Sequence, residues 1–160
     1  MPYETLHPSD IVVIDLDCNV IDGERRPSIE APLHTAVYKR RDDVFGVVHT
    51  HSTFCTAWAC RGKTMPCITS EGAELVGGTV KCAAFVPPGS IELAEVTSEA
   101  LGNDSAVLMG NHGVICVGAN IDKAFNNAII MEKEAKVAFY AYQMGDVNTL
   151  DEQMCIYLKE

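Results

Sequence analysis

The sequence predicts an α/β fold in which helices pack on the faces of a mainly antiparallel or mixed sheet. Short apolar runs typical of strands alternate with segments of helical periodicity. Several of those runs are separated only by tight turns, which favours hairpins over parallel crossovers. The chain has 160 residues, of which 48% are hydrophobic and 21% charged. That length and composition suit one compact domain spanning residues 1–160.

The first half of the chain begins with a strand and its return. Residues 11–16 are apolar and predict a strand, and a turn at 17–19 leads into a short strand that starts at Val20. A helix is expected over 28–41, because proline at 32 suits a first turn and apolar residues then follow helical spacing. The sequence then predicts a buried strand at 44–49 and a helix at 55–60.

The second half repeats this alternation. A strand is expected at 80–86, where Pro87-Pro88-Gly89 ends it, and Ser90 is the expected N-cap of a helix that closes at Gly102. Apolar runs at 106–109 and 114–117 predict two strands joined by a hairpin turn. The longest helix is expected from about residue 121 to 144, where its apolar stripe ends before a glycine.

Charge and composition exclude several functional classes. The formal net charge is −10, which disfavours nucleic acid and anionic membrane surfaces as partners. No apolar run approaches the ~18 residues that would cross a bilayer, and the N-terminus has no signal-peptide pattern. The seven cysteines form no CxxC pair, so a reducing, cytoplasmic location is expected and a structural zinc site built from cysteines is not.

Three histidines form the candidate site. His49 and His51 end a predicted strand, where residues two apart point to the same side. His112 lies between glycines in the predicted hairpin turn, which would hold it at the end of the sheet. Three imidazoles that leave one position open are typical of a catalytic zinc site. Two half-exposed strand histidines with no metal are the alternative.

Two residues at the start of the helix predicted over 28–41 complete the candidate set. Glu30 opens the helix, where a carboxylate either interacts favourably with the helix dipole or serves as a general acid and base beside a metal. Ser28 is either an ordinary N-cap or part of an anion site at the helix N-terminus.

Taken in order, four motifs resemble those of the class II aldolase/adducin family. They are Pro-Tyr-Glu-Thr-Leu at 2–6, Arg-Pro-Ser-Ile-Glu-Ala-Pro-Leu-His at 26–34, Val-Val-His-Thr-His-Ser at 47–52 and Gly-Asn-His-Gly at 110–113. The resemblance covers nearly the whole chain. It implies a three-layer α/β/α fold, a zinc-dependent lyase, and a homotetramer with active sites between subunits.

The resemblance also implies a role for each candidate residue. His49, His51 and His112 match the family's zinc ligands, Glu30 its catalytic carboxylate and Ser28 a group that holds the substrate phosphate. The expected reaction is cleavage of a ketose 1-phosphate, such as L-fuculose 1-phosphate, into dihydroxyacetone phosphate and an aldehyde through a metal-stabilised enediolate. One Zn²⁺ per chain is expected, with another divalent metal as the alternative.

The chain departs from the family pattern at three places. Family members usually carry an N-terminal extension that supplies much of the phosphate pocket, so the resemblance implies an N-terminally shortened domain. Ile29 stands where the aldolases have a second serine. By ungapped counting from the histidine pair, Ser70 stands where the aldolases have a tyrosine that reaches a neighbouring subunit's site.

Three other functions stay open within the resemblance. Related members epimerise ribulose phosphates or dehydrate a methylthio sugar phosphate, and the epimerase pattern prefers aspartate where Glu30 stands. The adducin branch is a non-catalytic interaction module. The three histidines argue against that last alternative, since a scaffold has no use for them.

Overall fold

The computed structural model describes residues 3–159, so Pro2 of the first motif lies outside the described residues. Two short 3₁₀ helices come first, at Tyr3–Thr5 and Pro8–Asp10. The elements that follow, in chain order, are β1 (Val13–Ile14), β2 (Val20–Asp22), α1 (Ala31–Arg40), β3 (Gly46–Thr50), α2 (Thr53–Ala59), α3 (Ser70–Leu75), β4 (Cys82–Ala83), α4 (Ile91–Leu101), β5 (Ala106–Met109), β6 (Gly113–Gly118), α5 (Ile121–Met144) and α6 (Glu152–Lys159).

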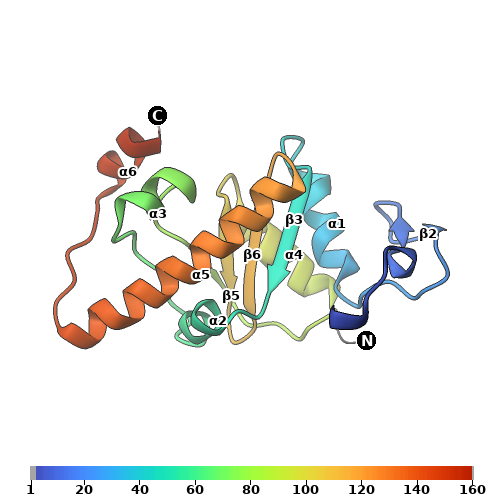
Figure 1. The fold of residues 1–160 in the computed structure, drawn as a ribbon, viewed down its shortest axis with the longest axis horizontal. Coiled ribbons are helices and arrows are strands. Elements are labelled where there is room, and N and C mark those ends of the chain that lie inside the picture. The colour runs from blue at the N-terminus through green and yellow to red at the C-terminus, as the bar shows by residue number, and fades with distance from the viewer. Residues whose placement is uncertain (1–2, 160) are drawn as a thin grey trace.

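The central sheet is mixed and has the strand order β3-β6-β5-β4. β6 pairs antiparallel with both β3 and β5, whereas β4 runs parallel to β5. Helices cover both faces: α2 and α5 lie on one and α1 and α4 on the other (Figure 1). The predicted three-layer α/β/α fold with a mixed sheet is therefore confirmed.

Strand alternation divides the buried side chains between two cores. Leu108, Val114 and Cys116 point toward α2 and α5. Their immediate neighbours Val107 and Ile115 point toward α1 and α4. Both cores are nearly free of solvent exposure, so the register of β3 and β6 is fixed: a shift by one residue would exchange the two faces.

The best-matched predictions are the elements with clear end signals. The Ser90 hydroxyl accepts a hydrogen bond from the backbone N–H of Leu93, and α4 ends at Gly102 as expected. α5 has the predicted bounds, and the β5–β6 hairpin turns where the sequence predicts it. Among the described residues, no helix combines the length and apolar character that crossing a bilayer requires.

Several predicted elements have different bounds. α1 begins at Ala31, three residues later than expected, because Glu30 and not Ser28 occupies the N-cap position. β1 and β4 are each two residues long, much shorter than the predicted strands at 11–16 and 80–86. α2 begins at Thr53, two residues before its predicted start. Two helices, α3 and α6, have no counterpart in the prediction; they pack against each other at the end of the molecule away from the β1–β2 hairpin (Figure 1).

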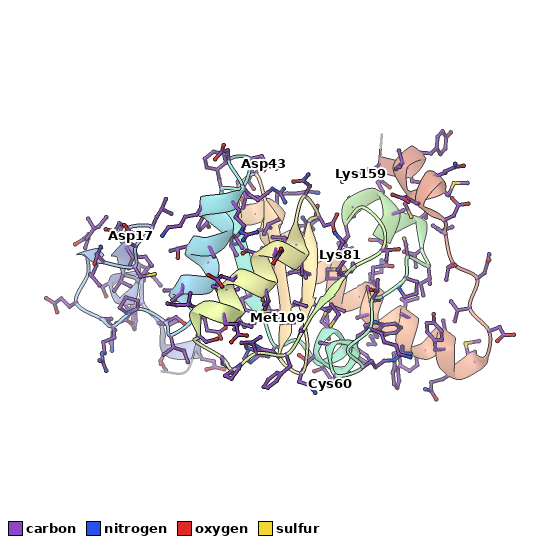
Figure 2. All side chains as sticks on the ribbon, turned by 180° about the vertical axis from the view of Figure 1, so that it is seen from behind. Asp17, Asp43, Cys60, Lys81, Met109 and Lys159 are labelled. Carbon is purple, nitrogen blue, oxygen red and sulfur yellow. The ribbon has the colours of Figure 1, made fainter. Side chains whose placement is uncertain are left out.

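The cysteines differ sharply in exposure, which predicts their reactivity. Cys60 is exposed and lies at the edge of the molecule (Figure 2), whereas Cys55, Cys67, Cys116 and Cys155 are buried. Burial raises the pKa of the Cys55 and Cys67 thiols to about 12. Since the thiolate is the reactive form, a maleimide added to the folded protein should label Cys60 first, and the four buried cysteines only after unfolding.

Peptide mass mapping of the labelled protein checks this order. A parallel reaction in guanidinium chloride is the control, in which all seven cysteines should react at similar rates. Labelling of Cys116 in the folded protein as fast as that of Cys60 would contradict the buried position of β6.

Candidate metal centre

Strand pairing explains why two of the histidines lie on the same side. In β3, Val47 belongs to the core beneath α1 and α4, so His49, two residues further, faces that side as well. His49 pairs with Ile115 of β6, and Thr50, the last residue of β3, pairs with Val114. His51 follows directly and lies just beyond the end of the strand. The Nε2 atoms of the two rings lie 3.0 Å apart, so the expected common orientation of the pair is present.

The turn between β5 and β6 brings the third histidine to them. Asn111 adopts a left-handed conformation with φ of 55°, and the backbone N–H of His112 donates to the carbonyl of Met109 at 3.0 Å. A side chain at Gly113 would place its Cβ 2.4 Å from the carbonyl oxygen of Thr50 and 3.0 Å from the His51 ring. Glycine at 113 is thus required for β6 to begin against the end of β3.

The three imidazole rings lie close together. Their ring centroids are 4.8 to 5.0 Å apart, and Nε2 of His49 lies 3.0 Å from Nε2 of His51. The side chain of His112 is only 7% exposed. Glu30 reaches the same point from the N-terminus of α1, with Oε2 2.9 Å from Nε2 of His49 and Oε1 3.6 Å from Nε2 of His112. One potential ligand atom from each of the four residues lies within 4.8 Å of the others.

The protonation state of His49 is determined by its surroundings. Its Nδ1 lies 3.0 Å from the carbonyl oxygen of Val114, and because a carbonyl can only accept, Nδ1 carries the proton. Burial lowers the pKa of His49 to about 4, against the opposing effects of this hydrogen bond and of Glu30. Burial likewise lowers the pKa of His112. Both rings are therefore neutral near pH 7, the form in which imidazole binds a metal.

The arrangement of donor atoms suits a bound cation. Because the proton of His49 is on Nδ1, its Nε2 presents a lone pair to Oε2 of Glu30 at 2.9 Å. Two acceptors this close repel each other unless a proton lies between them or a positive charge lies beside both. Oε1 of Glu30 is buried and has no hydrogen-bond partner. Three imidazoles with a carboxylate are a donor set that zinc and other divalent transition metals favour, so this cluster could bind such an ion.

The cluster forms part of the wall of a cavity of about 780 Å³. Ser28 lines it, and its hydroxyl accepts a hydrogen bond from the backbone N–H of Glu30 at 3.2 Å. The structure therefore places Ser28 beside the cluster, although not as the N-cap of α1. Sequence reasoning missed two other lining residues, Pro88 and the 58%-exposed Phe125 of α5. Neither belongs to a motif, so no local signal identifies them.

Ser70, the position that aligns with the family's tyrosine, lies elsewhere. It is the first residue of α3 and is not among the residues that line the cavity. His34, one turn beyond Glu30, is also outside the four-residue cluster. Burial lowers its pKa.

Comparison with known proteins places these residues in a family. Residues 1–139 match the model of the class II aldolase and adducin N-terminal domain. The chain is 36% identical over 150 residues to a 5-deoxy-D-ribulose 1-phosphate aldolase of Bacillus thuringiensis, covering 94% of this chain and 70% of that protein. It is 34% identical over 164 residues to an L-ribulose-5-phosphate 4-epimerase of Salmonella paratyphi C, covering 95% and 72%.

Solved structures indicate the same family. An L-fuculose 1-phosphate aldolase superposes with a TM-score of 0.95 at 32% identity, covering 99% of this chain and 74% of that one. An L-fuculose 1-phosphate aldolase from Glaciozyma antarctica superposes with a TM-score of 0.78 at 26% identity, covering 94% and 59%. The four-residue cluster, the mixed sheet and these matches agree, and the chain belongs to the class II aldolase and adducin family.

Proposed function

We propose that this protein is a metal-dependent aldolase that cleaves a ketose 1-phosphate into dihydroxyacetone phosphate and an aldehyde. The observation that carries the proposal is the meeting of unprotonated His49 Nε2 and the Glu30 carboxylate at 2.9 Å, with His51 and His112 beside them. The names of two similar proteins support the substrate class, since one acts on 5-deoxy-D-ribulose 1-phosphate and the other on L-fuculose 1-phosphate.

In this proposal His49, His51 and His112 hold one divalent cation, with zinc the expected ion. When bound, the cation supplies Lewis-acid stabilisation of the negative charge that develops on the substrate's oxygens. A base removes the proton of the C4 hydroxyl, and cleavage of the bond between C3 and C4 leaves its electron pair on the three-carbon fragment as an enediolate, while C4 becomes the aldehyde carbon. Glu30 then delivers a proton to C3, which completes dihydroxyacetone phosphate. The same carboxylate abstracts that proton in the reverse direction.

Three further features belong to the proposal. Ser28, on the cavity wall, contributes to binding the substrate phosphate. The protein forms a homotetramer with active sites between subunits, for which the exposed Phe139 and Tyr140 of α5 offer apolar surface. It acts in the cytoplasm, where its seven free thiols remain reduced. Sedimentation equilibrium tests the tetramer, and a monomer at assay concentrations would contradict shared sites.

The deciding experiment for the reaction is product identification. The protein, loaded with one equivalent of Zn²⁺, is incubated separately with L-fuculose 1-phosphate and 5-deoxy-D-ribulose 1-phosphate, and dihydroxyacetone phosphate is measured by mass spectrometry. We expect its formation from at least one substrate, with loss of the signal in chelator and its return on adding Zn²⁺. Unchanged substrate in both reactions would reject the aldolase proposal.

Epimerisation of a ribulose 5-phosphate is the second candidate, favoured by the 34% identity to a 4-epimerase. Cleavage between C3 and C4 followed by re-addition on the other face of the aldehyde would invert C4 with no net release. Product identity separates the candidates: an epimerase returns an isomer of unchanged mass, a dehydratase a product lighter by one water, and an aldolase two fragments. A protein that binds no metal would favour the adducin-like interaction module.

A further inference from the structure

The three histidines are not held equally well by their own backbone. His49 lies within the paired part of β3, and its ring is fixed by the carbonyl of Val114. His112 lies in a turn closed by a hydrogen bond to Met109. His51 comes after Thr50, the last paired residue of β3, and is exposed. Its position therefore depends on how residues 52–55, the start of α2, are attached to the rest of the fold.

That attachment is made by a carboxylate from α5. The backbone N–H of Phe54 donates to both oxygens of Glu132, at 2.9 and 3.1 Å, and the N–H of Cys55 donates to Oε2 at 2.9 Å. These are amides of the first turn of α2, which have no partner within that helix. Ser52, the N-cap of α2, makes no cap hydrogen bond with its own side chain. Glu132 therefore caps the N-terminus of α2, although it lies 78 positions from Phe54 and 77 from Cys55 in the sequence.

The surroundings of Glu132 favour the ionised form of its carboxyl group. Partial burial by itself raises the pKa of its carboxyl, but the hydrogen bonds from Phe54 and Cys55 outweigh burial and lower it. An ionised acceptor makes stronger hydrogen bonds than a neutral one. The interaction between Glu132 and α2 is therefore charge-assisted at neutral pH.

α5 itself is firmly placed on the sheet. It packs against β3 and β6 and lies beside α2 (Figure 1). The buried side chain of Asn127 donates to the carbonyl of Val117 at 2.8 Å, and Met131, next to Glu132, is completely buried. A continuous path of contacts thus leads from the sheet through α5 and Glu132 to the backbone that directly follows His51.

We propose that Glu132 is a positioning residue that holds His51 in place for metal binding. It contacts no ligand atom; it fixes the first turn of α2 and so the direction in which the chain leaves His51. This inference rests on the metal site of the proposed function and not on the reaction. Loss of a residue that orients a metal ligand commonly weakens metal binding 10- to 100-fold.

Metal affinity in the absence of sugar phosphate tests the inference. Apoprotein is titrated with Co²⁺ and with Zn²⁺ against a competing chelator, for the wild type, Glu132→Ala and Glu132→Gln. Asn120→Ala is the matched control, because Asn120 caps the N-terminus of α5 by accepting from the N–H of Lys123 at the other end of the sheet. We expect roughly 10- to 100-fold weaker binding in Glu132→Ala, an altered Co²⁺ absorption spectrum, and a smaller loss in Glu132→Gln, which keeps one oxygen acceptor. Asn120→Ala should bind within twofold of the wild type.

A double-mutant comparison shows whether the effect passes through His51. If it does, adding Glu132→Ala to His51→Ala should weaken binding no further, whereas adding it to His112→Ala should still do so. Equal affinity in the wild type and Glu132→Ala, or an equal loss in Asn120→Ala, would overturn the inference. If Glu132→Ala does not fold, the Glu132→Gln measurement decides. A wild type that binds Co²⁺ normally but cleaves no sugar phosphate would reject the aldolase proposal and leave this inference intact.

Discussion

Replacing Glu30 with glutamine is expected to reduce turnover by roughly 10²- to 10⁴-fold while the protein keeps about one metal ion per chain. The carboxylate is 11% exposed and lies against the imidazoles of His49 and His112. In the proposed reaction it carries the proton to and from C3. Glutamine has nearly the same shape but cannot carry that proton. Steady-state cleavage rates combined with metal analysis of the same preparation measure both effects.

A matched substitution tests whether charge alone is responsible. Glu152→Gln removes the same charge from the first turn of another helix, α6, away from the cluster, and should cleave at the wild-type rate. If Glu30→Gln also cleaves at that rate, Glu30 is not the acid and base. If it instead loses its metal, the carboxylate acts mainly as a fourth ligand, a role that its distance of 2.9 Å from His49 Nε2 permits.

Substitution of His112 by alanine should have the largest effect on metal binding. Structural zinc sites bind with about 10–16 kcal/mol, so one ligand of four represents roughly 3 kcal/mol, or about 100- to 1000-fold in the dissociation constant. The His112 side chain is nearly buried, so water replaces the lost nitrogen poorly. Competition with a chelator measures the constant, and cleavage should be lost at limiting Zn²⁺.

His7→Ala is the control for this substitution. It also removes a histidine, but one that is exposed and outside the cluster. Metal affinity of that variant should equal the wild type's. Retention of full affinity by His112→Ala would mean that the imidazoles do not share one ion, and the proposed function would lose its basis.

The fold was most predictable where local signals and burial agree. α4 has a serine N-cap and a glycine at its end, and β5 and β6 are short apolar runs around a turn, so each element is specified by its own residues. Strand alternation predicted that His49 and His51 point to the same side, although His51 lies just beyond the end of β3. The glycine-flanked turn also predicted that His112 lies near them. The structure shows why glycine is needed at 113: a side chain there would collide with the backbone of Thr50.

Elements that depend on distant contacts were not predictable. α3 has six residues, and one of its caps comes from Thr69, whose hydroxyl donates to the buried Glu134 of α5. α6 buries only Cys155, which packs beside Cys67 and Ala73. β4 is limited to two residues at the edge of the sheet. In each case the stabilising partner is far away in the sequence, so periodicity and end signals carry little of the information.

In the candidate site too, residues within motifs were predictable and residues brought in by distant contacts were not. Motif residues identified Glu30 and the three histidines, but not the contact between the Glu30 carboxylate and the imidazole nitrogens. Phe125 and Glu132 lie on α5 among residues of ordinary helical pattern, and nothing local marks one as a cavity wall or the other as a cap for α2. Only the packing of α5 across the sheet brings them to the site.

β3 pairs with β6 across a long stretch of sequence, and the contact between His49 and Val114 joins residues 65 positions apart. The proposed metal site is therefore incomplete until this long-range pairing has formed, and all three histidines could hold an ion only after β3 and β6 have paired. A bound ion would then oppose unfolding by mass action, and each tenfold excess of free ion over the dissociation constant would add about 1.4 kcal/mol to the free energy of unfolding. Metal supply would then govern the lifetime of this protein in addition to its chemistry.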